Sequence, residues 1–306
     1  MDLVVVGASG FIGRHLVAAL SARGDSVRVV GRDPRRLDRL FPRARRFAWD
    51  PAAGPLPADA VAGCDAVVNL AGEGVADRAW TPARKTLLRA SRLDAARGIV
   101  RAIEALGAGE RPAAFLQGSA IGYYGERGEA ELDESSTPGD NFLAWICRDL
   151  EAEARRAADV GTRVVVLRTG IVLGVEGGAL PRLVLPFRLF VGGPLGNGRQ
   201  WMSWIHRRDQ IGLILHALDR REIAGALNLT APRPARNVEV ARAIGVALGR
   251  PAIMPTPRFA LRLALGERVD FLLGSERVLP RAALASGYAF AFPEIGPALR
   301  DLLATG

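Results

Sequence analysis

Residues 3–13 read Leu-Val-Val-Val-Gly-Ala-Ser-Gly-Phe-Ile-Gly, and this stretch decides the fold. Four apolar residues run directly into a glycine turn, which predicts a buried parallel strand that leads into a helix. Gly7, Gly10 and Gly13 then form a Gly-x-x-Gly-x-x-Gly loop. In such a loop the first glycine allows a tight turn, the second lets the backbone approach a pyrophosphate, and the third lets helix and strand pack closely. The N–H groups of the helix's first turn would face the phosphates, so the stretch predicts a dinucleotide-binding loop.

A second apolar strand at residues 27–31 follows the predicted helix and is succeeded by Arg32. At this position an acidic residue would bind a ribose 2′-hydroxyl, whereas an arginine accommodates a 2′-phosphate. Arg32 therefore favours NADP over NAD as the cofactor. The alternative is an ordinary solvated arginine, because the chain carries 41 basic residues, of which only Lys85 is a lysine.

The composition excludes several classes of protein. The chain has 306 residues, 49% of them hydrophobic, but no uncharged apolar run long enough to span a membrane. The net charge of +9 comes from scattered arginines without a nucleic-acid-binding motif, so we expect no nucleic-acid partner. Cys64 and Cys147 are isolated, which predicts free thiols in a reducing cytoplasm, and no cluster of residues has metal-ligand spacing.

Strands and helices alternate through the first half of the chain, which predicts an α/β fold of the Rossmann type with a doubly wound parallel sheet. After Gly170, prolines and glycines predict loops and short elements. We expect an NADP-binding domain over 1–175, with 205–230 returning to it. A smaller C-terminal α/β substrate lobe would comprise 176–204 and 231–306. The predicted strands are 3–7, 27–31, 46–49, 65–70, 113–119, 163–168 and 226–229, and the predicted helices are 13–23, 83–106, 141–159, 208–219 and 237–248.

The sequence resembles the extended short-chain dehydrogenase/reductase superfamily, the group of NAD(P)-dependent epimerases and dehydratases. More closely, it is similar to an atypical branch of uncharacterised epimerase-family proteins with a C-terminal domain of unknown function, here at about residues 250–300. The resemblance covers nearly the whole chain. The motifs that carry it are Gly7-Ala-Ser-Gly-Phe-Ile-Gly13, Asn69-Leu-Ala-Gly72, Ser119-Ala-Ile-Gly-Tyr-Tyr-Gly125, Arg168-Thr-Gly-Ile-Val-Leu-Gly174, Gly196-Asn-Gly-Arg-Gln-Trp-Met-Ser-Trp-Ile-His206 and Arg277-Val-Leu-Pro280.

The resemblance implies a set of cofactor-binding residues at the ends of the first four strands. The turn at Asn69–Gly72 would line the ribose and nicotinamide, and Asp50 would lie near the adenine; an ordinary turn is the alternative in both places. The predicted cofactor residues are Gly7, Ser9, Gly10, Phe11, Ile12, Gly13, Arg32, Asp50, Asn69, Leu70, Ala71 and Gly72.

The catalytic motif of that superfamily is missing. Its members use a Tyr-x-x-x-Lys pair, in which the lysine lowers the pKa of the tyrosine. Here Leu143 and Cys147 occupy those positions, counting back from Glu151, and Lys85 lies far upstream. The remaining candidate catalytic residues follow the fifth strand and are Ser119, Tyr123 and Tyr124, with packing beneath the substrate lobe as the alternative for the tyrosines.

The predicted substrate lobe contains polar residues interleaved with indoles, a pattern suited to a small polar ligand. Its candidate substrate-binding residues are Arg199, Gln200, Trp204 and His206, although lobe packing for Trp204 and a structural histidine for His206 are alternatives. We therefore expect an NADP-dependent oxidoreductase or epimerase for a small carbonyl, hydroxyl or sugar-like compound. The rival interpretation is an NADP(H)-binding regulatory or redox-sensing protein without turnover. Two long amphipathic helices further predict a homodimer.

Overall fold

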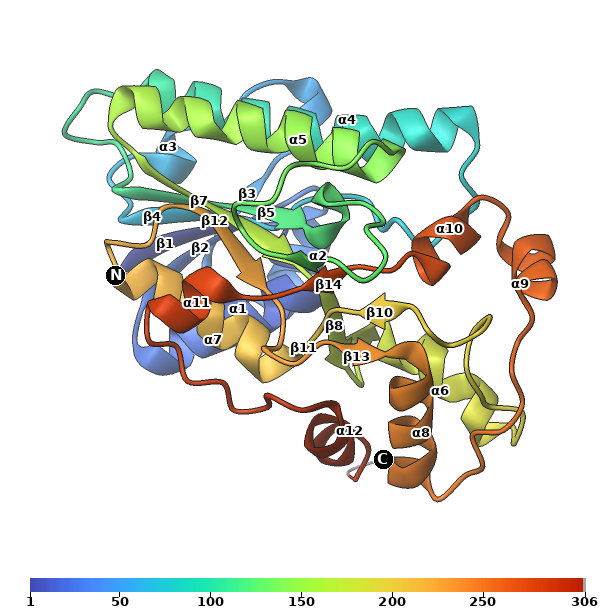
Figure 1. The fold of residues 1–306 in the computed structure, drawn as a ribbon. Helices are drawn as coiled ribbons and strands as arrows, with labels where there is room; N and C mark the ends of the chain where they lie inside the picture. Colours follow the sequence, from blue (N-terminus) through green and yellow to red (C-terminus); the bar gives the residue numbers. More distant parts are fainter. Residues whose placement is uncertain (305–306) are drawn as a thin grey trace.

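The computed structural model of the protein describes residues 1–304. Its centre is a seven-stranded sheet in which every neighbouring pair is parallel, in the order β12-β7-β5-β4-β1-β2-β3 (Figure 1). The strand order reverses between β1 and β4, as it does in doubly wound folds. The predicted fold class is therefore confirmed. The strands of this sheet are β1 (Asp2–Val6), β2 (Ser26–Gly31), β3 (Arg45–Ala48), β4 (Ala66–Asn69), β5 (Ala114–Ala120), β7 (Arg163–Thr169) and β12 (Gly225–Leu229).

Helices cover both faces of this sheet, which explains why β1 is apolar at successive positions. Leu3 and Val5 pack into the core on one face, whereas Val4 and Val6 pack into the core on the other. One face is covered by α1 (Phe11–Arg23), α2 (Pro34–Leu40), α7 (Arg207–Asp219) and α11 (Arg281–Ala285). The opposite face is covered by α3 (Ala58–Val61), α4 (Pro82–Glu104) and α5 (Phe142–Arg155), the last followed by the 3-10 helix η3 (Arg156–Val160).

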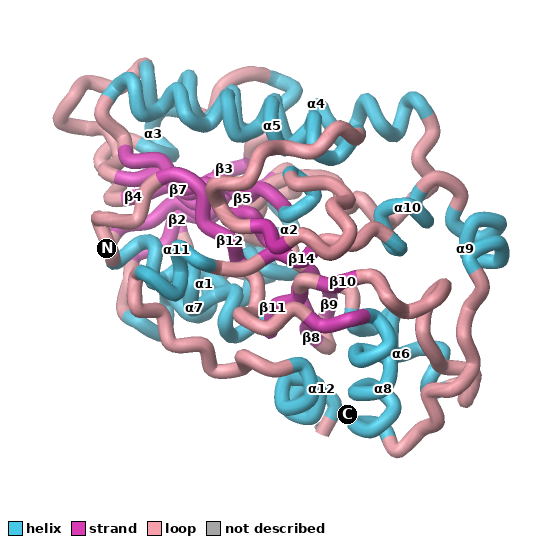
Figure 2. The backbone as a smooth tube through the Cα atoms, viewed as in Figure 1, coloured by secondary structure: helices cyan, strands magenta, loops and turns pink. Residues whose placement is uncertain are grey.

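A second core, separate from those on the two faces of the central sheet, lies among shorter strands and helices from the second half of the chain. Figure 2 shows the backbone of these elements. A three-stranded sheet contributes β8 (Ile171–Gly174), β9 (Gly177–Gly178) and β11 (Trp204–His206), and a two-stranded sheet contributes β10 (Trp201–Met202) and β13 (Ala235–Arg236). These strands pack with α6 (Leu180–Arg188), α8 (Asn237–Leu248) and α12 (Ile295–Leu303). The remaining elements are α9 (Arg258–Leu265), α10 (Arg268–Leu273), and a parallel pair formed by β6 (Glu131–Leu132) and β14 (Arg277–Val278).

The segment after Gly170 is more regular than its prolines suggest. Pro181 lies in the first turn of α6, where the missing N–H has no intrahelical partner to lose. Pro186 lies inside the same helix, which ends two residues later at Arg188.

The predicted helix over 141–159 was too long, because the α-helix ends at Arg155 and continues only as η3.

Candidate functional site

The three loop glycines are needed for different reasons. Gly7 has φ +76°, and a Cβ there would lie 2.8 Å from the backbone nitrogen of Ala71. A Cβ at Gly13 would lie 2.5 Å from the Gly7 carbonyl oxygen, so this glycine permits close helix–strand packing. At Gly10 the nearest atom would be the Gly7 oxygen at 3.2 Å, with nothing else within 4 Å. Gly10 therefore leaves an open face beside the start of α1.

The start of α1 is suited to an anion. Gly10 is its N-cap and supplies no side-chain hydrogen bond, and the first turn has no acidic residue. The first-turn N–H groups and the helix dipole are therefore available to phosphate oxygens. The side chains of Phe11 and Ile12 serve packing instead. A Cβ at Gly174 or Gly177 would lie 2.6 Å from the Phe11 ring, and Ile12 packs against the core beneath α1.

Two arginines flank the loop. Arg32 follows β2 with 67% of its side chain exposed and pairs with Glu73 at 2.9 Å. The guanidinium of Arg36 donates to the carbonyl oxygen of Ser9 at 3.1 Å. Asp33, the acidic residue beside Arg32, accepts a hydrogen bond from the backbone N–H of Arg36 and caps α2. Both guanidinium groups can therefore donate hydrogen bonds to a 2′-phosphate, which for Arg32 would replace its exposed ion pair with Glu73.

The turn after β4 is shaped by a buried amide. Asn69 is fully buried, its Oδ1 accepts from the Ala71 N–H at 3.0 Å, and its Nδ2 donates to Gln117 at 2.9 Å. Asn69 thus acts by bringing the backbone of Leu70–Gly72 against the glycine loop. Asp50 caps the short helix η1 (Pro51–Ala53) through the Ala52 N–H, and its adenine contact stays a prediction.

Ser119 belongs to a buried network at the end of β5. Its hydroxyl donates to Glu151 at 2.9 Å, and Arg168 pairs with both oxygens of the same carboxylate at 3.0 and 2.9 Å. Glu151 is fully buried and also accepts from Arg155 at 2.9 Å. The Ser119 hydroxyl proton is committed to Glu151, so the oxygen of Ser119 is left to accept hydrogen bonds.

The two candidate tyrosines have different environments. Tyr124 is fully buried, donates to Asn228 at 2.7 Å and accepts from Arg168 at 2.9 Å. Burial raises the pKa of Tyr124 to about 12. These facts argue against the predicted catalytic role of Tyr124, because the hydroxyl has no access to a substrate. Tyr123 is half-buried, with the Arg168 guanidinium 3.5 Å from its ring centroid, and its hydroxyl has no hydrogen bond among residues 1–304.

The helix that should carry a tyrosine–lysine pair offers no replacement. Cys147 is buried beside Ser119, and burial raises the pKa of its thiol to about 11. The thiol is therefore protonated at neutral pH and cannot supply the positive charge of a lysine. Lys85 lies on α4, where it forms an ion pair with Glu267.

The four predicted substrate residues do not converge. Arg199 and Gln200 line a cavity of about 590 Å³ between the loop at 126–129 and the segment at 257–275. Trp204 and His206 are each only 1% exposed and lie away from this cavity. Trp204 packs in the second core, whereas His206 caps α7 and stacks on Phe292 with ring centroids 3.9 Å apart. Neither side chain faces this cavity, and their contact with a substrate stays a prediction.

Sequence reasoning missed the partners of Ser119. Glu151, Arg168 and Asn228 were not predicted as site residues, yet they determine how Ser119 and Tyr124 are held. A signal for Glu151 was present, because helical spacing places this charged residue on the apolar stripe of α5 with Cys147 and Leu150.

No group of three or more metal-ligating side chains that could hold an ion occurs among residues 1–304. Within the same residues, no helix is both long enough and apolar enough to cross a membrane.

Comparison with known proteins gives one consistent result. Residues 3–229 match the NAD dependent epimerase/dehydratase family, and residues 256–302 match a domain of unknown function, DUF1731. The epimerase family protein SDR39U1 of Bos taurus is 40% identical over 99% of this chain and 100% of its own length.

Two solved structures are also similar. The human epimerase family protein SDR39U1, isoform 2, crystallised with NADPH, is 39% identical with a TM-score of 0.89 over 99% of both chains. The nucleoside-diphosphate sugar epimerase from Corynebacterium glutamicum is 29% identical with a TM-score of 0.79, over 100% of this chain and 58% of that chain.

Proposed function

Because this chain belongs to the NAD dependent epimerase/dehydratase family, we propose that it binds NADP(H) and catalyses an oxidoreduction or epimerisation. The substrate would be a small carbonyl, hydroxyl or sugar-like compound. The observation that carries the cofactor assignment is the exposed guanidinium of Arg32 at the end of β2, together with the uncapped start of α1 at Gly10 and with Asp33 engaged as a helix cap. The similar human protein crystallised with NADPH supports the same assignment.

The residues that would hold the cofactor follow from this geometry. The first-turn N–H groups of α1 would bind the pyrophosphate, and Arg32 with Arg36 would bind the 2′-phosphate. The turn Leu70–Gly72 would form the floor beneath the ribose. When bound, NADP(H) supplies or accepts a hydride at the nicotinamide ring.

Ser119 would orient the reacting oxygen of the substrate. Since its own proton is donated to Glu151, its oxygen can accept a hydrogen bond from a substrate hydroxyl. Tyr123 or an ordered water would then exchange the proton, because Tyr124 is buried and Cys147 is neutral. This arrangement makes an unaided phenol a weak base, so we expect slow turnover.

A second function is supported by the missing tyrosine–lysine pair. With Leu143 and Cys147 at those positions, the protein would bind NADP(H) as a regulatory or redox-sensing protein without turnover. Calorimetric titration with NADPH and NADH tests the cofactor assignment shared by both functions. NADPH oxidation with a panel of aldehydes and ketones detects net reduction, and NMR of sugars incubated with catalytic NADP⁺ detects epimerisation, which returns the hydride and consumes no cofactor. Turnover in either assay supports the enzyme, and its absence in both supports the sensor.

We also propose that the protein acts as a homodimer in the cytoplasm. The candidate interface comprises α4 and α5, whose outer surfaces carry ion pairs between the helices, including Arg89 with Asp149 at 2.9 Å. Light scattering at micromolar concentration tests the assembly, and a monomer would contradict it.

A further inference from the structure

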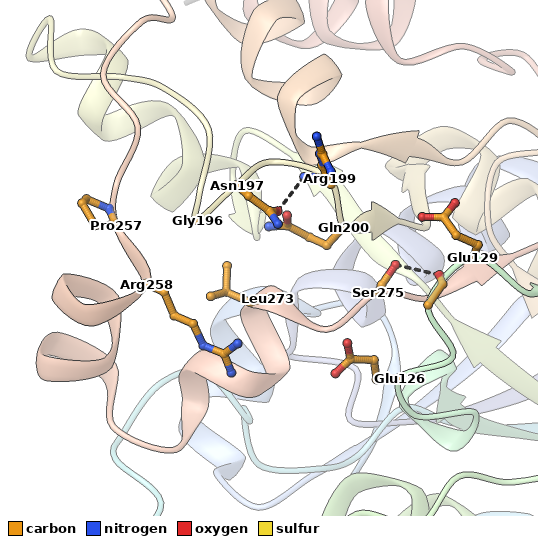
Figure 3. A pocket seen from close by; sticks show the side chains of 11 residues that line it. Glu126, Glu129, Gly196, Asn197, Arg199, Gln200, Pro257, Arg258, Leu273 and Ser275 are labelled. Atoms are coloured by element: carbon orange, nitrogen blue, oxygen red, sulfur yellow. Dashed lines mark hydrogen bonds between the residues drawn. The ribbon is translucent and has the colours of Figure 1, made fainter.

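The cavity beside Gln200 has two walls (Figure 3). One wall is the loop that follows Tyr124, with Glu126 and Glu129. Along the chain, this loop comes shortly after β5, the strand that carries Ser119. The other wall includes Arg258 at the start of α9 and Leu273 at the end of α10. Figure 3 shows the side chains of Glu126 and Arg258 directed into the space between the walls.

The charges that line this cavity balance. Its charged residues are Glu126, Glu129, Arg199 and Arg258, two of each sign. Glu129 is paired with Arg236 at 2.7 Å, and Arg258 is paired with Asp270 at 3.1 Å. The side chains of Glu126 and Arg199 have no ion pair or hydrogen bond in the part of the chain that the structure describes.

The unpartnered polar groups include both acceptors and donors. Gln200 is only 7% exposed, and its Nε2 donates to the Leu195 carbonyl at 3.1 Å while its Oε1 has no partner among residues 1–304. The Glu126 carboxylate is a second free acceptor. Asn197 uses its Oδ1 to accept from the backbone N–H of Arg199 at 3.0 Å, which leaves its NH₂ group as a donor.

A diphosphate does not fit this set. Its oxygens only accept hydrogen bonds and carry at least two negative charges, so they would face the two free acceptors with a single unpaired arginine as compensation. A hydroxyl group both donates and accepts, so several hydroxyls can satisfy the carboxylate, the amides and the guanidinium together. Burial, and then the charge of Glu126, raise the pKa of Glu276, the residue next to the lining residue Ser275.

We propose that this cavity binds an uncharged, hydroxyl-rich part of the substrate, as in a free sugar or polyol, and disfavours nucleoside diphosphates. The proposal rests on the proposed function, since it assigns this cavity to the substrate of the proposed reaction. It places Glu126 and Gln200 as hydroxyl-binding residues, with Arg199 and Asn197 as donors on the segment that carries Gln200.

Thermal shift and calorimetry on the NADPH-saturated protein test this subsite. The probes are D-glucose, myo-inositol and sorbitol as uncharged ligands and UDP-glucose as the diphosphate. We expect saturable binding of at least one uncharged probe and weaker binding of UDP-glucose. Glu126→Gln should weaken the uncharged probe about tenfold, the scale of a hydrogen bond to a charged group. Glu126→Arg should strengthen UDP-glucose binding, because it removes a negative charge and adds a positive one.

Glu110→Gln is the matched control, since Glu110 is exposed on the loop between α4 and β5 and does not line the cavity. Tighter binding of UDP-glucose than of every uncharged probe would overturn the proposal. So would the absence of saturable binding by all uncharged probes, or equal effects of Glu126→Gln and Glu110→Gln. Failure of NADPH to bind is measured in a separate titration and counts against the proposed function alone.

Discussion

The guanidinium of Arg168 forms a two-point ion pair with the carboxylate of Glu151, with nitrogen–oxygen distances of 3.0 and 2.9 Å. The side chains of both residues are buried, at 3% and 0% exposure. Arg168 comes from β7 and Glu151 from α5, and the same carboxylate accepts the hydroxyl of Ser119 from β5. The pair therefore connects a helix and two strands at the point where the proposed chemistry occurs.

Removing one partner of this pair should lower the unfolding free energy of the protein. Arg168→Ala leaves the Glu151 carboxylate buried without its two-point partner, and the expected loss is about 3–5 kcal/mol of unfolding free energy. Arg155→Ala removes the half-exposed partner of the same carboxylate and should cost about 1 kcal/mol or less. Urea titration measures both losses. Equal losses in the two variants would show that Arg168 is not the residue that stabilises the buried charge.

Substitutions of Ser119, Tyr123 and Tyr124 should differ in how far they lower the turnover rate and how far they lower stability. Ser119→Ala should lower turnover about a hundredfold if its oxygen orients the substrate. It should also cost about 1–3 kcal/mol of unfolding free energy, because it removes one hydrogen bond from the buried Glu151 carboxylate. Tyr123→Phe should lower the rate about tenfold or less, because this tyrosine lacks a lysine to activate it. Tyr124→Phe should chiefly destabilise the protein, by about 1–3 kcal/mol, since the bond to Asn228 is lost inside the core. A dead Tyr123→Phe variant beside an unaffected Ser119→Ala variant would reverse these roles.

The sheet and the phosphate loop could be predicted because their signals are local. The apolar run at 3–6 and the glycine spacing each specify a backbone conformation without help from distant residues. The partners of Ser119 could not be predicted in this way, because Glu151 lies 32 residues beyond Ser119 on another element and Arg168 a further 17 residues along the chain. The surroundings of Trp204 and His206 could not be predicted for a related reason, since residue type leaves a ligand and packing equally open, whereas the distant Phe292 stacks on His206 and α12 shares the second core with Trp204.

The cofactor preference should depend on Arg32 and not on its acidic neighbour. A charge-assisted contact to the 2′-phosphate should make NADPH bind about ten- to a hundredfold more tightly than NADH. Arg32→Glu should abolish this preference. Asp33→Asn should preserve it, because that carboxylate is engaged as the cap of α2. Calorimetric titration of both variants with both cofactors gives the answer, and an unchanged preference in Arg32→Glu would refute the assignment.

Substitutions at two loop glycines should affect different properties, cofactor binding at Gly10 and stability at Gly13. Gly10→Val brings its Cβ close to a single atom, the Gly7 carbonyl oxygen at 3.2 Å, so the fold should persist while NADPH binding is abolished. Gly13→Val places Cβ against the Gly7 oxygen, and the expected effect is a destabilisation of about 1–3 kcal/mol through overpacking. Circular dichroism melting with and without NADPH distinguishes the two. A stabilising shift by NADPH in Gly10→Val would mean that the loop does not bind the pyrophosphate.

The carboxyl of Glu276 should make stability fall with rising pH. Burial, and then the charge of Glu126, raise its pKa from an ordinary 4.5 to about 7. Between these values the unfolded chain releases the proton while the folded protein keeps it, so unfolding becomes progressively easier until the pH passes about 7. The accumulated penalty is at most about 3 kcal/mol above that pH.

Glu276→Gln keeps the shape of the protonated side chain and removes the titration, so its stability should exceed that of the parent at about pH 8 and match it at about pH 5. Glu126→Gln should give an intermediate slope, because it removes the second cause of the raised pKa and leaves the burial. Chemical denaturation across this pH range measures the slopes. Parallel profiles for the parent and Glu276→Gln would mean that Glu276 is ionised throughout, and that the potential beside the cavity is less negative than the positions of Glu126 and Glu276 imply.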